Sequence, residues 1–317
     1  MATLQRQLDQ EQVAVALEML EAIAVANHKA KRRTFQVEDL QDALKGKPHL
    51  LSLWSHLLED GCIPLVKILT LGHSTGEFQF SHLSFQEALF VRALKAGKSG
   101  KDFWSHDAEL SCNLNDPFYR NTFLIGRKHL GEALAISRPS LNFDCQPRLS
   151  DVGRGGLPHL LARVQSLTEL NLANVSLRNH QEVEALVSAL TIGKPNLHVL
   201  GLSRCQLNQK TVRAIGTLLQ RCPLQRLDLE GNSAFLVSDA DVDGLTETVG
   251  NQGLQGLEHL CLRWCHIQPA IATSVRYFLE TCCQRNLILD VQGNRGLTMK
   301  MLEGFTELKG CLPCAVQ

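Results

Sequence analysis

The second half of the chain carries a periodic pattern of leucines that predicts short buried strands. From residue 167 onward, the pattern L-x-x-L-x-L-x-x-N/C recurs, with copies that begin at positions 167, 197, 224, 257 and 286. The starts are therefore 30, 27, 33 and 29 residues apart. Alternating leucines bury one face of a strand, and a period near 29 residues leaves room for a helix after each strand. We expect a curved parallel sheet with helices along its outer side.

The residues that close each copy, and those that follow it, extend this prediction. An asparagine or cysteine at the end of a copy is expected to bond backbone groups where the chain leaves the strand. Apolar residues at helical spacing come next: Val183, Leu186, Val187 and Leu190, then Val212, Ile215, Leu218 and Leu219. The copies are Leu167-Leu170-Leu172 with Val175, Leu197-Leu200-Leu202 with Cys205, Leu224-Leu227-Leu229 with Asn232, Leu257-Leu260-Leu262 with Cys265, and a degenerate fifth with Leu289, Val291 and Asn294.

The pattern is that of a leucine-rich repeat. Its long period and alternating Asn and Cys resemble the ribonuclease-inhibitor subtype, which NACHT-type receptors also carry. We place an α/β leucine-rich-repeat solenoid of about five to six repeats over residues 141–317. Residues 141–143 and 157–164 are expected to form an imperfect first repeat that caps one end.

The residues between the leucines are expected to point into the concave side of the sheet, because a strand exposes alternate positions. Trp264 stands out, since an exposed tryptophan beside an arginine is typical of an interface anchor. The alternative is a tryptophan at the rim, packed on its neighbours. The candidate contacts to a protein partner are Glu169, Asn171, Ser203, Arg204, Arg226, Asp228, Glu230, His259, Arg263 and Trp264.

The first half of the chain predicts a mostly helical domain. Three helices followed by a hairpin make a winged helix, which we place over residues 1–96, with a helical connector over 97–140. The expected elements are a helix over 12–27, a short strand around Phe35, helices over 37–44 and after Pro48, and strands over 63–71 and 77–80.

The sequence FSHLSFQE follows the hairpin at residues 80–87. Ser84 and Glu87 have the spacing of a capping box ahead of the next helix. The stretch resembles the end of the winged-helix domain in NACHT-family proteins, where an F-x-H-x-S-F-Q-E-like motif precedes a second helical domain. In that family the histidine reaches the phosphates of bound ADP, so the resemblance implies that His82 is this residue.

One feature of that family is missing from this sequence. A NACHT core would carry a G-x-x-x-x-G-K-[ST] phosphate loop, and only 97–99 imitates its end, with Arg92 where the first glycine belongs. We therefore expect the C-terminal part of such a receptor, or a paralogue without the motor. The alternative function is a nucleotide-dependent switch with His82 as phosphate sensor, which needs an NTPase domain upstream or in trans. Otherwise His82 is a histidine at the hairpin end.

Three motifs imitate catalytic or metal sites. Ser74 lies in a G-x-S-x-G turn between two expected strands, whereas a nucleophile elbow needs a strand, a turn and a helix. Residues 239–244 resemble the opening of a calcium loop, but Gly250 stands where a glutamate ligand is required, and Ser238 is placed to cap a repeat helix. The sequence predicts no enzyme, no metal and no cofactor. The densest set of possible ligands, which is not expected to converge, is His259, Cys261, Cys265 and His266.

Composition and charge narrow the class of partner. The 317 residues include 32 basic and 32 acidic ones, divided evenly between the halves, so neither half is a cationic surface for nucleic acid. No apolar run reaches the roughly 18–20 residues of a membrane span. The eleven cysteines fit a reduced, cytoplasmic protein, and the single CxxC pair, Cys311 and Cys314, has no second pair at zinc spacing. We expect a cytoplasmic protein that binds a protein partner.

Overall fold

The computed structural model describes residues 10–71, 76–98, 106–126, 139–144, 149–161, 167–192, 196–250 and 256–297. The chain divides into two compact units. One comprises Met1–Phe103 and Phe118–Ala133, and the other comprises Trp104–Pro117 and Leu134–Gln317. The stretch expected to be a helical connector, 97–140, is thus shared between the two units.

The first unit is mostly helical, as the sequence predicts, with a small antiparallel sheet in the order β1-β3-β2. Strand β2 begins three residues later than expected, because Leu65 has a left-handed backbone (φ 60°) that interrupts an extended run. The elements are α1 (Gln10–Lys29), β1 (Thr34–Gln36), α2 (Val37–Ala43), α3 (Pro48–Glu59), β2 (Val66–Leu71), β3 (Gly76–Phe80), α4 (Leu83–Lys95) and the 3-10 turn η1 (Pro117–Tyr119), with further helical turns over 120–126.

Aromatic side chains hold the small sheet against the helices. Phe78 of β3 packs on Phe35 of β1 and on Trp54 of α3, with ring centroids 5.6 and 5.1 Å apart. Met19 and Ile23 of α1 are buried in the same core. The core thus joins all three strands' inner face to α1 and α3, and burial of side chains of this size is the main stabilising contribution.

A second cluster in the first unit surrounds a fully buried polar side chain, His28. His28, at the end of α1, is 0% exposed and packs between Phe90, Phe118 and Tyr119 at centroid distances of 4.4 to 5.2 Å. Its Nε2 lies 2.6 Å from Thr122 Oγ1. This cluster joins α1 and α4 to the helical turns over 120–126.

The hydrogen bonds around His28 fit a neutral ring. Gln86 Nε2 donates to Arg32 O (2.9 Å) and lies 3.5 Å from His28 Nδ1, so Nδ1 faces a donor and Nε2 carries the proton. Burial, helped by the charge of Arg33, lowers the pKa of His28 to about 3. Burial also raises the pKa of the neighbouring Glu87, while Arg33 and Asn121 oppose that rise.

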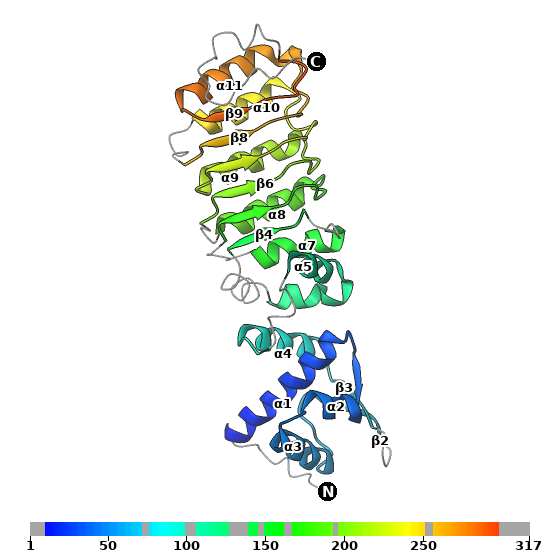
Figure 1. Ribbon diagram of the computed structural model, residues 1–317. Coiled ribbons are helices and arrows are strands. Elements are labelled where there is room, and N and C mark those ends of the chain that lie inside the picture. The colour runs from blue at the N-terminus through cyan, green and yellow to red at the C-terminus, as the bar shows by residue number, and fades with distance from the viewer. Residues whose placement is uncertain are drawn as a thin grey trace. The chain divides into compact units, whose positions relative to one another are not determined.

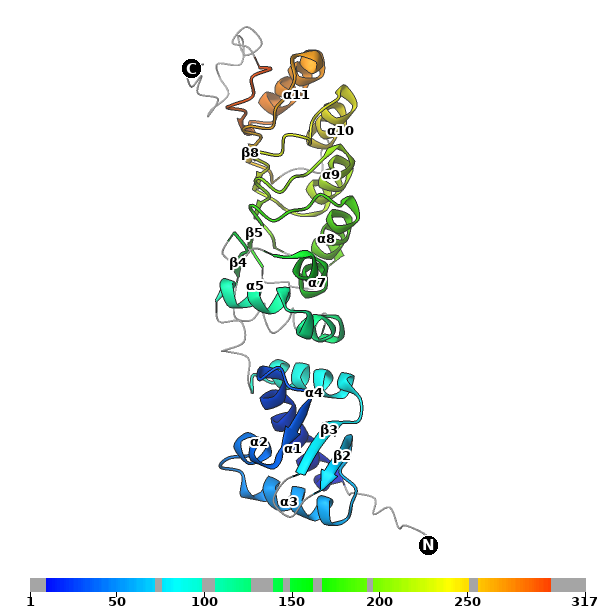
Figure 2. The same cartoon turned by 90° about the vertical axis from the view of Figure 1, so that its right-hand side faces the viewer.

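The second unit contains a six-stranded parallel sheet in sequence order, with helices along one face (Figures 1 and 2). This confirms the α/β class and the parallel sheet expected from the leucine pattern. The elements are α5 (Asp107–Asn115), β4 (Ser140–Asn142), α7 (Asp151–Leu161), β5 (Glu169–Asn171), α8 (His180–Ile192), β6 (Val199–Gly201), η2 (Gln209–Thr211), α9 (Val212–Arg221), β7 (Arg226–Asp228), α10 (Asp239–Gly250), β8 (His259–Cys261), η3 (Pro269–Ile271), α11 (Ala272–Gln284) and β9 (Ile288–Asp290).

The strands align on their central leucines. In every pair the middle residues are register partners, and each central side chain is at most 1% exposed. The apolar positions expected on helices α8 and α9 are buried against this layer. The leucine column therefore fixes the register of the sheet, since a slip by one residue would expose every one of them. The column consists of Leu141, Leu170, Leu200, Leu227, Leu260 and Leu289.

The asparagines that close two repeats hydrogen-bond the backbone of the preceding repeat as well as their own. Asn232 Nδ2 donates to Leu202 O (2.9 Å) and Leu229 O (2.8 Å), and its Oδ1 accepts from Leu207 N (3.0 Å). Asn294 makes the equivalent three bonds one turn later. One buried amide thus satisfies three backbone groups across two repeats.

Cysteine closes the alternate repeats and bonds fewer groups. Cys205 Sγ donates to Leu172 O (3.0 Å) and Cys265 Sγ to Leu229 O (3.3 Å). In both cysteine turns the next residue is left-handed, Gln206 (φ 61°) and His266 (φ 55°), and the residue after it donates its N–H to the asparagine of the following repeat. Each asparagine therefore both donates a hydrogen bond to the preceding cysteine repeat and accepts one from it.

Replacing Asn232 by alanine should destabilise the second unit by about 3 kcal/mol, because each buried backbone group left unpaired costs about 1–3 kcal/mol. Replacement by cysteine should cost less, since a thiol can still donate to a carbonyl as Cys205 does. Urea unfolding followed by circular dichroism measures both changes. An alanine variant with the wild-type midpoint would contradict this role.

The neutral His28 should make the first unit sensitive to acid. Its folded pKa lies below the unfolded value of 6.5, so its contribution is complete above that pH and is lost as the pH falls toward about 3. Comparison with His28→Gln isolates this effect from the opposite contribution of Glu87. Between about pH 6 and pH 4, the wild type should lose stability relative to the variant by up to about 1.4 kcal/mol per pH unit, and parallel pH profiles would contradict the prediction.

Candidate functional site

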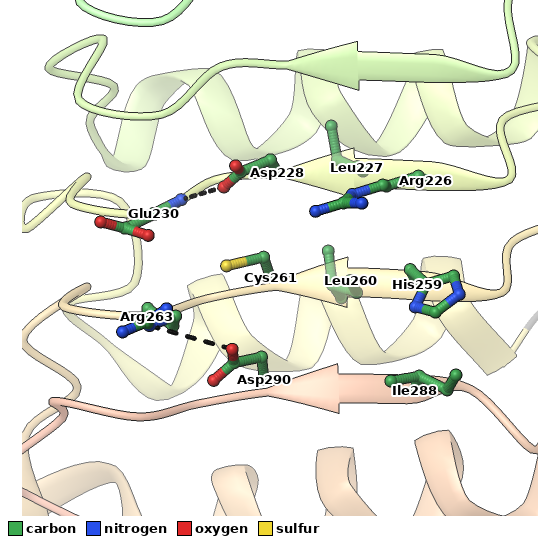
Figure 3. A pocket seen from close by; sticks show the side chains of 10 residues that line it. All are labelled: Arg226, Leu227, Asp228, Glu230, His259, Leu260, Cys261, Arg263, Ile288 and Asp290. Carbon is green, nitrogen blue, oxygen red and sulfur yellow. Dashed lines mark hydrogen bonds and ion pairs between the residues drawn. The ribbon is translucent and has the colours of Figure 1, made fainter. Parts of the chain in front are cut away.

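A shallow hollow of about 240 Å³ lies over strands β7, β8 and β9 (Figure 3). It opens on the sheet face turned away from helices α7–α11, which we call the open face; none of the described helices covers β7–β9 on that side (Figure 2). The backbone at Leu227 and Leu260 forms part of its floor. The other lining side chains are Arg226, Asp228, Glu230, His259, Cys261, Arg263, Ile288 and Asp290.

The register of the strands arranges these side chains in columns. The first strand positions align Arg226 with His259 and Ile288, and the third positions align Asp228 with Cys261 and Asp290. Neighbouring strands are about 4.8 Å apart, so members of a column lie side by side. Over β7–β9 the open face therefore carries one column that contains a basic side chain, Arg226, and beside it a column that contains two acidic ones, Asp228 and Asp290.

The acidic column is built by a backbone requirement. Asp228 Oδ1 accepts from Glu230 N (2.9 Å) and Asp290 Oδ1 accepts from Gln292 N (3.1 Å), which ends each strand with a side-chain-to-backbone turn. On β5 the same bond runs from Ala173 N to Asn171 Oδ1 (2.9 Å). Either an amide or a carboxylate oxygen can accept this bond, so the turn does not require the negative charges of Asp228 and Asp290.

Most charges of the hollow are compensated within the chain. Arg263 Nε lies 3.8 Å from Asp290 Oδ2 (Figure 3), and Arg204 Nη2 lies 3.2 Å from Glu230 Oε1. Within the described part of the chain, Arg226 and Asp228 take part in no ion pair. These two opposite charges thus face the solvent-filled hollow from one strand, uncompensated.

The cysteines of this region are protonated thiols. Burial, followed by the fields of Asp228 and Asp290, raises the pKa of Cys261 to about 12. The pKa of Cys265 is likewise raised to about 12, chiefly by burial. Thiols in this state are poor nucleophiles and poor metal ligands. Over the described residues, no three His, Cys, Asp or Glu side chains converge as a metal site.

Glu169 and Asn171 lie on the same open face, on β5, but outside the hollow. Glu169 is exposed, and its Oε2 accepts from Ser140 Oγ (3.4 Å). The side chain of Asn171 lies over Gly201, where an added Cβ would approach Asn171 Oδ1 to 2.7 Å. Ser203, half-buried, follows β6 on the same side. These residues extend the candidate surface beyond the hollow.

Arg204 and Trp264 were expected on the strands but belong to the turns that follow them, and neither lines the hollow. Both have left-handed backbones (φ 54°), as do Gly231 (73°) and Gly293 (74°) at the equivalent position of the next repeat. The Trp264 ring lies directly on Gly293, and Arg204 Cγ on Gly231. Trp264, still 48% exposed, therefore matches the alternative of a packed tryptophan at the rim.

The leucine pattern did not single out Ile288 and Asp290, which line the hollow. Their repeat is degenerate, with Asn286 where the first leucine belongs. Alignment of the fifth copy on its central leucine, Leu289, identifies both residues, because it places Asp290 at the position equivalent to Asp228. Cys261, a possible metal ligand by sequence, lies between the two carboxylates of its column and is part of the surface.

In the first unit, His82 is exposed and forms the N-cap residue of α4. Its Nδ1 lies 2.8 Å from Ser84 Oγ. Because α4 begins at Leu83, Ser84 lies inside the first turn and is not the N-cap residue that the sequence predicts. Gln86 and Glu87 of the same motif are buried, at 0 and 1% exposure. A phosphate contact of His82 stays a prediction.

The other sequence motifs separate into two groups. Residues 239–244 are helical at the start of α10, where Ser238 Oγ accepts from Asp241 N (3.4 Å) and donates to Asp241 Oδ2 (2.7 Å); the expected cap is confirmed, and this carboxylate is engaged in it. Ser74, Cys311 and Cys314 lie outside the described residues.

Comparisons with known proteins add no assignment. No protein-family model matches the chain, and no curated protein matches it. Of the helices in the described ranges, none combines the length and the apolar character needed to cross a bilayer. The candidate site therefore depends on the geometry of the open face.

Gly293→Ala should destabilise the second unit more than Gly231→Ala. Both substitutions impose a side chain on a left-handed backbone, which costs about 1–2 kcal/mol, but the new Cβ meets the rigid Trp264 ring in one case and the flexible Arg204 stem in the other. We expect the midpoint of thermal unfolding to be lower for Gly293→Ala by about 3 °C or more. Trp264→Ala in both backgrounds should remove the difference; an unchanged difference would show that the ring does not cause it.

Proposed function

We propose that this chain is a non-enzymatic leucine-rich-repeat protein that recognises a protein partner through the open face of its solenoid, and that its first unit is a winged-helix domain. The strand-and-helix period, the leucine column and the alternating Asn and Cys turns support a ribonuclease-inhibitor-type solenoid. In such a solenoid the open face is the concave one.

The observation that carries the proposal is the uncompensated charge on a helix-free sheet face. Arg226 and Asp228 stand exposed or half-exposed over an open hollow, and charge left unpaired at a surface favours a complementary partner. A stable protein interface buries about 800 Å² on each side, far more than this hollow supplies. The partner must therefore extend along the open face, toward Glu169 on one side and the Trp264 rim on the other.

The order of winged helix, helical segment and repeats supports a more specific proposal. It is the order found in the C-terminal part of NACHT and leucine-rich-repeat receptors, which the 80–87 motif also resembles. On this proposal the chain is the sensing or regulatory part of an NLR-like, innate-immunity-type signalling protein that acts in the cytoplasm. An NTPase domain, upstream or in trans, would then be a further partner, with His82 available at the surface.

The test is affinity capture from cytoplasmic extract with quantitative mass spectrometry. The double variant Glu169→Ser, His259→Ser changes the first strand position on β5 and β8. Serine is chosen because Ser140 already occupies this position on β4. The control, Arg213→Ser with Glu247→Ser, alters exposed positions on helices α9 and α10. We expect the open-face variant to lose a specific partner about tenfold, whereas the control retains it. If every captured protein binds both variants alike, the open face is not the recognition surface.

A further inference from the structure

Arg226 and Asp228 present opposite charges at a fixed spacing on one strand. They are the first and third residues of β7, so both side chains project from the open face. Two residues of a strand separate their Cα atoms by about 6.8 Å. Leu227 between them points into the core and is 0% exposed. The strand therefore fixes the spacing of the two Cα atoms from which the guanidinium and the carboxylate extend over the open face.

Among the described residues, neither charge takes part in an ion pair. The register partners on β8 are His259 and Cys261, which carry no carboxylate or guanidinium group. The nearest further charges are already engaged, since Arg263 is paired with Asp290 and Glu230 with Arg204. Asp228 uses Oδ1 for its own backbone turn, and its carboxylate also accepts a hydrogen bond from the neighbouring Cys261 thiol. A basic group of the partner would therefore join these two donors at the carboxylate.

The same spacing occurs in any extended peptide. Side chains at alternate positions of an extended segment point to one side and lie about 6.8 Å apart, so an acidic and a basic residue separated by one residue would meet Arg226 and Asp228 together. The α-carboxylate and α-ammonium groups of a free amino acid are bonded to the same carbon and therefore lie closer together than this spacing. The spacing thus favours a peptide segment over a small molecule.

We propose that the partner docks on β7–β9 with an extended segment in which an acidic and a basic side chain are separated by one residue. The acidic side chain pairs with Arg226 and the basic one with Asp228, while the intervening residue faces away. This deepens the proposed function and depends on it. The segment can run in either direction, since reversal exchanges the order of its two charges.

The test uses defined peptides on the full chain. A biotinylated peptide with the central sequence Val-Glu-Thr-Lys-Val is displayed on tetrameric streptavidin, so that multivalency makes weak binding measurable, and its binding to immobilised protein is followed by interferometry. The matched peptide Val-Glu-Lys-Thr-Val has the same composition but puts its charges on opposite sides. We expect the first peptide to bind about five- to tenfold more strongly, and equal binding would overturn the proposal.

Double-mutant cycles assign each charge. Asp228→Asn removes the charge and keeps the Oδ1 acceptor, as Asn171 does on β5, and Arg226→Gln removes the other charge. Arg226→Gln should weaken binding of the Val-Glu-Thr-Lys-Val peptide about threefold but should not change binding of the same peptide with Glu replaced by Gln. Asp228→Asn should likewise weaken binding of Val-Glu-Thr-Lys-Val about threefold but should not change binding of the peptide with Lys replaced by Met. Unchanged unfolding midpoints confirm that the variants fold.

Absence of coupling in both cycles would overturn the inference. A different result would contradict the proposed function: the variant with Glu169→Ser and His259→Ser would capture every protein as well as the wild type does. If those substitutions abolish capture while the peptides show no coupling, the open face recognises its partner by other chemistry, and only the inference on the charged segment is wrong.

Discussion

Hydrogen bonds from buried turn side chains to the backbone of the neighbouring repeat are the interaction on which the second unit depends. Each strand has three residues, and backbone bonds between repeats continue past the strands, as from Gly231 N to Arg263 O. Asn232 and Asn294 add to this ladder, because each bonds two buried carbonyls and one N–H across two repeats. The leucine column adds burial and register, and the turns make the repeats continuous.

The open face follows from this constraint. Since the turns hold successive strands in register, side chains at equivalent positions form columns, and the chemistry of a column depends only on which residue each repeat supplies. Asp228 and Asp290 satisfy the same backbone turn as Asn171. The sheet thus positions charges on its surface through bonds that are needed for folding, which holds the candidate site rigid without a dedicated supporting structure.

The periodic features and the backbone bonds of the closing Asn and Cys side chains were accessible from the sequence, whereas the backbone handedness of the turns was not. Leu170 and Leu200 repeat at a spacing that specifies strand, burial and parallel order together, and the helices after them follow from the period. Backbone handedness leaves no hydrophobic signal, so the placement of Trp264 in a turn and the late start of β2 at Leu65 could not be foreseen. The burial of His28 and Gln86 could not be predicted either, because histidine and glutamine are not typical core residues.

The left-handed turn residues give the second unit a longer period than its leucines do. A bulky side chain at this turn position, Arg204 or Trp264, is followed in the next repeat by Gly231 or Gly293, over which it lies. Cysteine and asparagine turns alternate in step with this order. From Arg204 to Gly293 the repeating unit is therefore a pair of repeats of about 60 residues. Deletion of a single repeat within this stretch would place two bulky turns or two glycine turns on each other, as already happens at its start, where the left-handed Asn174 is followed by Arg204 without a glycine.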